Sequence, residues 1–174
     1  MILIVDTFYG ENWARVAGVT VESPDARQVW QEYTVMVADP APYEPGQFYK
    51  RELPGILELL KTLPKQPDAV IIDGYCEVGG HDGLGNHLYN TTQIPVIGLA
   101  KTPYVGANAE PVVFGKGSKP LYVSSAGISL TDAQALVQRL ESPHRIPTLV
   151  KRADQLSRGI DQFGRHFNFP TPDP

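Results

Sequence analysis

Residues 67–73, Pro-Asp-Ala-Val-Ile-Ile-Asp, are the stretch that decides the fold. Residues 69–72 are all apolar and too few for a helix, so they predict a strand buried on both faces of an α/β sheet. A second apolar run, residues 95–100, follows a glycine-rich loop and ends at Lys101. Parallel strands need a crossover connection between them, usually a helix. The two runs therefore predict neighbouring central strands joined in a βαβ unit.

The segments around this unit predict the rest of a mixed sheet. Three segments rich in β-branched side chains are separated by turn residues, which indicates an antiparallel meander; they are residues 2–5, 16–21 and 29–37. The spacing of leucines predicts an amphipathic helix of about 15 residues between positions 48 and 63. We also expect a short helix near 86–90, a hairpin of 111–114 with 121–125, and helices over 129–140 and 148–158. This order predicts an α/β fold with a mixed sheet and flanking helices, an order found in the ribonuclease H-like fold and shared by other mixed α/β folds.

The chain has 174 residues, enough for one domain with a core of its own. We place that domain at residues 1–158 and expect a tail without structure of its own at 159–174. The sequence has no apolar run of the roughly 18 residues that a membrane span needs, and the apolar residues 2–5 are followed directly by the carboxylate of Asp6. We therefore expect neither a membrane protein nor a signal peptide. The single Cys76 excludes an intramolecular disulfide and indicates a reducing, cytoplasmic compartment.

Charge is distributed unevenly along the chain. The formal net charge of −4 argues against a protein that coats nucleic acid by neutralising its phosphates. The segment 139–165 nevertheless gathers six basic side chains: Arg139, Arg145, Lys151, Arg152, Arg158 and Arg165. A local basic patch beside a carboxylate cluster is compatible with a nuclease. Composition therefore leaves nucleic acid open as a partner without favouring it.

Two carboxylates follow predicted strands at the edge where α/β sheets assemble their sites. Asp6 ends the first strand and Asp73 ends the first buried strand. Together they could hold one or two Mg²⁺ ions, which prefer oxygen ligands and activate water beside a phosphate. Each aspartate could equally do no more than end its strand, and Glu52 could do no more than favour the dipole of its helix. Lys101 could contact a phosphate or could be a solvated lysine in a loop. His87 could be a general base or a polar residue whose hydrogen bonds are satisfied within the protein.

Seven short motifs resemble those of the endonuclease V family, and they occur in the family's order. Residues 43–52, Tyr-Glu-Pro-Gly-Gln-Phe-Tyr-Lys-Arg-Glu, are similar to Y-x-P-G-x-x-x-x-R-E. Residues 67–74 resemble P-D-x-x-x-x-D-G, and residues 94–102 resemble I-P-x-I-G-V-A-K-[ST]. The others lie at 86–88, 122–124, 129–130 and 145–154. One such motif is weak, whereas seven in order identify the chain as similar to a short, divergent member of this family.

The resemblance implies a metal-dependent endonuclease with a ribonuclease H-like fold. It implies hydrolysis of a phosphodiester bond near deoxyinosine in DNA or inosine in RNA, leaving 3′-hydroxyl and 5′-phosphate ends. It implies Mg²⁺ as the cofactor, with Mn²⁺ as the alternative, held by Asp6 and Asp73. The partner that it implies is nucleic acid rather than a membrane, and we expect a monomer.

The family pattern also assigns roles to individual residues of this chain. The residues with an implied catalytic role are Asp6, Glu52, Asp73, His87, Lys101 and Asp154. Residues 42–45 resemble the wedge that the family inserts beside the damaged base, where an aromatic ring can separate or stack on bases. The residues with an implied substrate contact are Tyr43, Pro45, Gly46 and Arg51.

Two segments depart from the family pattern: residues 145–149 read Arg-Ile-Pro-Thr-Leu in place of R-x-P-E-P, and the loop after Asp73 is shorter than in the family. After the second metal-binding aspartate the family reads D-G-h-G-x-x-H-P-R, whereas this chain reads Asp-Gly-Tyr-Cys-Glu-Val-Gly-Gly-His-Asp over residues 73–82, with only His81 near the missing triplet. Two other functions remain as alternatives. One is a non-catalytic nucleic-acid-binding protein of the same fold, and the other is a different ribonuclease H-like nuclease, such as a junction resolvase.

Overall fold

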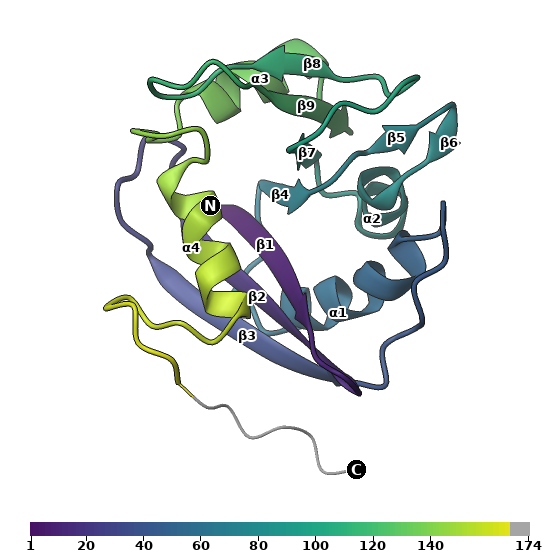
Figure 1. Cartoon of the computed structure of the whole chain (residues 1–174), viewed down its shortest axis with the longest axis vertical. Helices are drawn as coiled ribbons and strands as arrows, with labels where there is room; N and C mark the ends of the chain where they lie inside the picture. Colours follow the sequence, from purple (N-terminus) through teal and green to yellow (C-terminus); the bar gives the residue numbers. More distant parts are fainter. Residues whose placement is uncertain (168–174) are drawn as a thin grey trace.

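The computed structural model describes residues 1–167, and in that range seven strands form one mixed sheet (Figure 1). The strand order is β3-β2-β1-β4-β7-β9-β8. In chain order these strands are β1 (Ile2–Tyr9), β2 (Trp13–Val21), β3 (Gln31–Ala38), β4 (Ala69–Asp73), β7 (Val96–Ala100), β8 (Glu110–Val112) and β9 (Leu121–Ala126). A separate small hairpin joins β5 (Glu77–Val78) to β6 (His81–Asp82).

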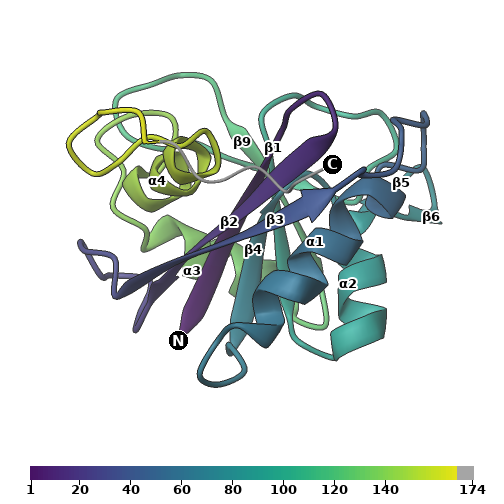
Figure 2. The ribbon, with the colours of Figure 1, turned by 90° about the horizontal axis from the view of Figure 1, so that it is seen from below.

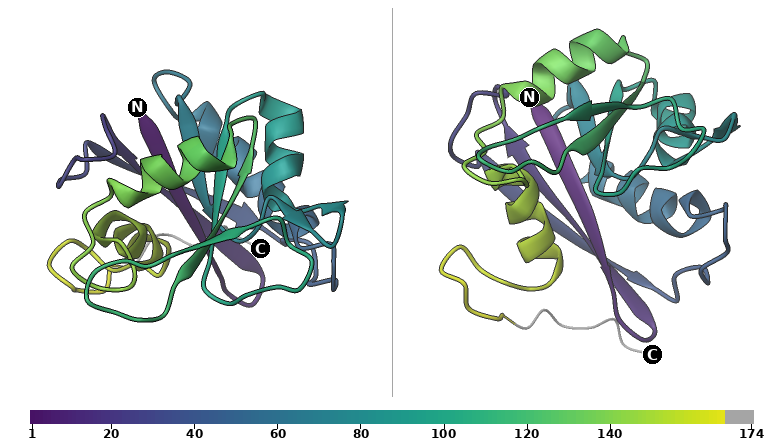
Figure 3. Two further views of the ribbon diagram at one scale, coloured as in Figure 1. Left: turned by 90° about the horizontal axis from the view of Figure 1, so that it is seen from above. Right: turned by 45° about the horizontal axis from the view of Figure 1, so that its top comes forward.

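Helices cover both faces of the sheet, as Figure 2 shows from below. One face carries α1 (Tyr49–Lys61) and α2 (Leu84–Thr92). The other face carries α3 (Leu130–Gln138) and α4 (Thr148–Ser157), which the two views of Figure 3 show from other sides. This layering divides the buried side chains into two clusters, one under each pair of helices. The predicted mixed sheet with flanking helices is confirmed.

The strand β1 shows how the sheet separates the two clusters. Ile2 and Ile4 belong to the cluster under α3 and α4, whereas Leu3 and Val5 belong to the cluster under α1 and α2. Successive side chains of a strand point to opposite faces, so this alternation is expected. It also places the next even position, Asp6, on the face that carries α4.

The register of the central strands sets the position of the site. Strand β1 runs parallel to β4 with Ile4 opposite Ile71, and β4 runs parallel to β7 with Asp73 opposite Leu99. Extending the first pairing by two residues brings Asp6 level with Asp73. Asp73 ends β4, at the edge where open α/β sheets place their sites. The prediction that Asp6 ends its strand is wrong, because β1 continues to Tyr9 against β2. Asp6 nevertheless lies beyond the last residue of β1 that pairs with β4.

Most of the predicted elements are found at or near their expected positions. The hairpin of β8 and β9 is confirmed, and so is the cap of α3, where the Ser129 hydroxyl accepts a hydrogen bond from the Asp132 amide at 3.1 Å. The first strand is longer than the apolar run because residues 6–9 pair with residues 14–17 of β2. The predicted helix from 48 to 63 is α1, and it contains Pro54.

Residues 159–167 follow a defined course that depends on contacts with the domain. Gly159 has a φ of 75°, and a Cβ there would meet the Arg15 guanidinium at 2.7 Å. The Phe167 amide donates to the Gly159 carbonyl at 2.8 Å, and Arg152 of α4 donates to the Ile160 carbonyl at 2.8 Å. The boundary between domain and tail stays a prediction, and residues 168–174 lie outside the described residues. Across residues 1–167, none of the helices has the length and apolar character needed to cross a membrane.

Candidate active site

Asp6 sits half-buried on β1 and is held by the end of α4. The Ser157 hydroxyl donates a hydrogen bond to Asp6 Oδ2 at 2.5 Å. Burial raises the pKa of Asp6 from its ordinary value of 3.8 to about 6. The hydrogen bond from Ser157 opposes this increase, and the charges of Asp154 and Asp73 add to it. Asp6 is thus a carboxyl group in a crowded acidic environment that a cation would relieve.

Asp73 and Lys101 meet at the ends of β4 and β7. The Lys101 ammonium lies 2.5 Å from Asp73 Oδ2, and both side chains are partly exposed. Partial burial by itself would lower the pKa of Lys101, but the hydrogen bond and charge of Asp73, with the charges of Asp6 and Asp154, raise it above 10.5. Lys101 therefore carries a positive charge next to the two aspartates at neutral pH.

Glu52 is a buried acid on α1, with 7% of its surface exposed. The Tyr9 hydroxyl donates to Glu52 Oε1 at 2.8 Å. Burial raises the pKa of Glu52 from 4.5 to about 7, hydrogen bonds from Thr7 and Tyr9 oppose that increase, and the charge of Asp6 adds to it. Its position in the sequence alone allowed an acid that only favours the helix dipole, whereas the structure buries it in the lining of a hollow that Asp6 also lines. The catalytic role that the family resemblance implies for Glu52 stays a prediction.

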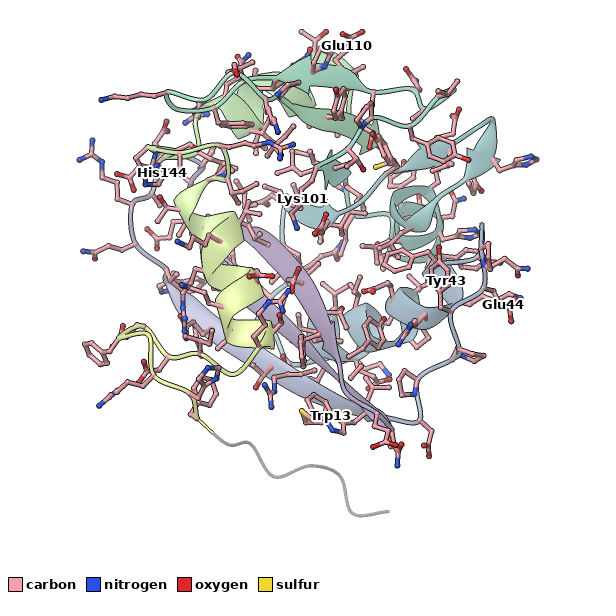
Figure 4. All side chains as sticks on the ribbon, viewed as in Figure 1. Trp13, Tyr43, Glu44, Lys101, Glu110 and His144 are labelled. Atoms are coloured by element: carbon pink, nitrogen blue, oxygen red, sulfur yellow. The ribbon has the colours of Figure 1, made fainter. Side chains whose placement is uncertain are left out.

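Two hollows meet at the aspartates and make one cleft across the strand ends. The α1-side hollow, of about 580 Å³, is lined by Tyr43, Glu52 and Thr102 in addition to Asp6, Asp73 and Lys101. The α4-side hollow, of about 380 Å³, is also lined by Asp6, Asp73 and Lys101. Its other polar lining residues come from the segment before α4 and from α4 itself: His144, Arg145, Lys151 and Asp154. In Figure 4, Lys101 lies over the centre of the molecule, with His144 near the start of α4 and Tyr43 on the opposite side. A larger and mostly apolar hollow of about 710 Å³ beside α1 lacks both aspartates, so we do not assign chemistry to it.

Asp154 lines the α4-side hollow from α4, where its Oδ1 accepts from Arg158 Nε at 3.0 Å. Several of the basic residues in segment 139–165 are similarly paired with acids. Arg152 binds both oxygens of Glu32, while Arg139 pairs with Asp25 and Arg165 with Asp161. The basic side chains of this segment that line the cleft are Arg145 and Lys151. Arg145 also donates to the carbonyl groups of Lys101 and Pro120, so it supports the loop that carries Lys101.

Tyr43 lies on the loop before α1, with 62% of its surface exposed, and its ring lines the α1-side hollow. The neighbouring Pro45 and Gly46 are exposed, and Gly46 has a φ of 77°, a left-handed conformation that favours glycine. Arg51 lies over the Tyr9 ring, 3.5 Å from its centroid, and so supports the tyrosine that binds Glu52. The implied substrate contacts of these four residues stay predictions.

His87 and His81, the two histidines near motifs of the family, do not line the cleft. The His87 ring stacks on Tyr49 with 3.5 Å between ring centroids, which joins α2 to the start of α1. His81 is exposed on the β5–β6 hairpin. Asp82 accepts hydrogen bonds from Asn86 and Asn90 of α2. His87 and His81 line neither hollow within the described part of the chain, and a catalytic role for His87 stays a prediction.

The donor set at the cleft fits a hard divalent cation. Across residues 1–167, no three acidic, histidine or cysteine side chains converge as a ready-made metal cage. Mg²⁺ does not need such a cage, because it prefers oxygen ligands, keeps several waters and is commonly bound by one or two carboxylates. Asp6 and Asp73 supply that pair, and the raised pKa of Asp6 reflects burial and nearby acids that a cation would offset.

Two supporting residues were missed by reasoning from the sequence. Ser157 binds Asp6 across 151 residues of chain, and Tyr9 binds Glu52 across 43. Ser157 lies three residues after Asp154 on the same helix, and Tyr9 lies three residues after Asp6 on the same strand. Proximity to a candidate acid was the one available signal, and it does not distinguish these two from other polar neighbours.

Family profiles, known sequences and solved structures were each compared with this chain, and all three comparisons match the same family. The endonuclease V family profile matches residues 1–155. An endonuclease V of Streptomyces avermitilis is 33% identical, and the match covers 82% of this chain and 72% of that protein. The crystal structure of endonuclease V from Streptomyces avermitilis has a TM-score of 0.76 and 30% identity, covering 90% of this chain and 79% of that one.

Two animal structures have the same fold. The catalytic domain of human endonuclease V has a TM-score of 0.76 at 27% identity, covering 90% of this chain and 80% of that one. Endonuclease V of Ciona intestinalis, in complex with a 24mer DNA containing an inosine followed by a ribo-adenosine, has a TM-score of 0.78 at 21% identity, covering 90% of this chain and 84% of that one. The ribonuclease H-like fold expected from the order of elements is thereby confirmed. The family profile and these relatives show that the chain belongs to the endonuclease V family.

Proposed function

We propose that this protein is a metal-dependent endonuclease that hydrolyses a phosphodiester bond near a deaminated base and leaves 3′-hydroxyl and 5′-phosphate ends. The observation that carries the proposal is that Asp6 and Asp73, on neighbouring parallel strands, line the same two hollows with Lys101 beside them. Family membership and the inosine-containing DNA bound by the Ciona intestinalis relative support nucleic acid as the substrate.

Asp6 and Asp73 are the residues that would hold Mg²⁺, with Mn²⁺ as the alternative. When bound, such an ion polarises a phosphoryl oxygen, activates water and stabilises the leaving oxygen. Lys101 provides a fixed positive charge for the phosphate or for the developing charge on the leaving oxygen. Glu52, whose pKa is raised to about 7, can hold or release a proton at its carboxyl group near neutral pH.

Tyr43 provides an aromatic ring at the α1-side hollow, on a loop that two prolines stiffen. A rigid aromatic at the mouth of an acidic cleft is suited to entering a base stack, and opening a stack costs least at a damaged or mismatched base. We assign to this loop the preference for deaminated bases. Deoxyinosine in DNA and inosine in single-stranded RNA are both within the proposal.

The test is a nicking assay on matched DNA and RNA oligonucleotides, with and without one inosine, in Mg²⁺ or in EDTA. We expect metal-dependent cleavage near inosine, and we expect Asp6→Asn and Asp73→Asn to abolish it without unfolding the protein. Asp25→Asn is the matched control, because this exposed aspartate pairs with Arg139 and lines neither hollow.

The outcomes separate the proposed function from its alternatives. Equal cleavage in EDTA, or full activity of Asp73→Asn, would refute the metal assignment. Binding to inosine-containing strands without cleavage would favour a non-catalytic nucleic-acid-binding protein. Cleavage of branched DNA in preference to inosine-containing strands would favour a junction resolvase.

A further inference from the structure

Ser157 is the last residue of α4, and its side chain is completely buried. Its hydroxyl oxygen lies 2.5 Å from Asp6 Oδ2 and 2.8 Å from the carbonyl oxygen of Asp154, one turn earlier in the helix. The first contact connects α4 with β1, elements that are separated by more than a hundred residues of chain. Ser157 thus lies directly behind one of the two proposed metal ligands.

The bond to Asp6 is not needed to satisfy the buried serine. A helical serine commonly bonds to a carbonyl of its own preceding turn, and the Asp154 carbonyl is within reach for that purpose. The partner that gains from the contact is Asp6, because the bond holds Oδ2 of its carboxylate in a fixed direction. Hydrogen bonds of this kind orient the side chains that bind metal ions.

The surrounding framework holds the serine in place. Arg15, a buried arginine on β2, donates from Nη1 to the Ser157 carbonyl at 3.1 Å. The chain then turns through Gly159, where the close approach of the Arg15 guanidinium leaves no room for a Cβ. Leu156, next to Ser157, packs in the cluster beneath α3 and α4. The position of the hydroxyl is therefore set by the sheet as well as by its own helix.

From this geometry we infer that Ser157 is a positioning residue for Asp6. Its hydroxyl binds Oδ2, restricts rotation of the carboxylate and keeps it ready to bind the divalent ion in the cleft. This inference rests on the proposed function. Groups that orient a ligand from behind typically change metal affinity or activity by about 10- to 100-fold when they are removed.

The experiment compares Ser157→Ala and Ser157→Thr with the unmodified protein. Mg²⁺ binding to the protein without nucleic acid is measured by calorimetry, and nicking is measured as a function of Mg²⁺ concentration. We expect Ser157→Ala to weaken Mg²⁺ binding by about 10- to 100-fold. At saturating Mg²⁺ we expect a lower kcat with an unchanged KM for the oligonucleotide. Threonine keeps the hydroxyl, so it should recover most of the loss.

Thr20→Val is the matched control, since Thr20 is a fully buried residue of β2 whose hydroxyl donates to the Gln31 carbonyl at 3.0 Å. Thermal unfolding of each variant shows whether it is folded and how far its stability has changed. If Ser157→Ala binds Mg²⁺ as Thr20→Val does, and the two variants differ only in melting temperature, Ser157 is a packing residue and the inference is wrong. A loss that threonine does not recover, in a folded Ser157→Thr protein, also contradicts it. If the unmodified protein neither binds Mg²⁺ nor cleaves, the proposed function fails together with the inference.

Discussion

Replacing Glu52 by glutamine should stabilise the metal-free protein at pH 8 and have little effect at pH 5. Glu52 is 7% exposed on α1, and burial raises its pKa from 4.5 to about 7. Its carboxylate must therefore be charged in a buried position whenever the pH lies above that value. Glutamine has nearly the same shape, and its amide oxygen can still accept the hydrogen bond from Tyr9.

The sign and size of the effect follow from proton linkage. The folded state holds the Glu52 proton more tightly than the unfolded chain between pH 4.5 and about pH 7, so stability falls as the pH rises through that interval and the loss is complete above it. At about 1.4 kcal/mol per pH unit, the interval sets an upper limit of about 3 kcal/mol on the cost of the charge. For a chain of this size that is roughly 6–12 °C in melting temperature.

The assay is thermal unfolding in EDTA at pH 5, 6, 7 and 8, with the unmodified protein and the Glu52→Gln variant side by side. Glu58→Gln is the control, because Glu58 is an exposed acid on the same helix and pairs with Lys61. The difference in melting temperature between Glu52→Gln and the unmodified protein should grow with pH, while Glu58→Gln follows the unmodified protein throughout. A Glu52→Gln protein that is no more stable at pH 8, or a difference that is the same at pH 5 and pH 8, would refute the reasoning.

Four further substitutions examine other parts of the molecule. Lys101→Ala should reduce kcat by about 10²- to 10³-fold, because a positioned charge acts on the transition state. Single-turnover rates measure this loss, and a loss confined to salt-sensitive binding of the oligonucleotide would contradict the role. Tyr43→Ala should lower the ratio of kcat/KM for inosine-containing over undamaged strands without changing the melting temperature, and an unchanged ratio would exclude the wedge. Arg152→Met should cost about 2 kcal/mol in urea unfolding, because it leaves the Glu32 carboxylate without its two hydrogen bonds. The exposed Arg139→Met should cost less than about 1 kcal/mol, and equal losses would show that burial of the pair does not matter.

Much of the fold could be predicted from local patterns. The apolar runs before Asp73 and Lys101 became β4 and β7 because strands buried on both faces need apolar residues at every position. Ser129 caps α3 as its spacing to Asp132 indicated, since a helix N-terminus needs acceptors for its free amides. These features depend on neighbours within a few residues, which is the range over which sequence patterns are informative.

The environment of each acid could not be predicted in this way. Glu52 has the sequence context of an exposed first-turn residue, and its burial depends on Tyr9 and Arg51 packing over one another. The basic segment 139–165 suggested a local patch, whereas Arg152 is held by Glu32 of β3 and Arg139 by Asp25. Such pairings join residues from separate elements, so they exist only after the sheet and its helices have assembled.

The sequence by itself determined the order of the main strands and helices, the resemblance to the endonuclease V family and the position of Asp73 at the end of β4, because apolar periodicity and motif spacing are local properties of the chain. Tertiary structure decided that Asp6 and Asp73 line one cleft and that Lys101 pairs with Asp73. It also decided that Ser157 bonds to Asp6. The physical reason is that strand register and helix packing bring together groups that are 28 to 151 residues apart in the chain. Burial in that assembly then raises the pKa of Asp6 and of Glu52 above their ordinary values.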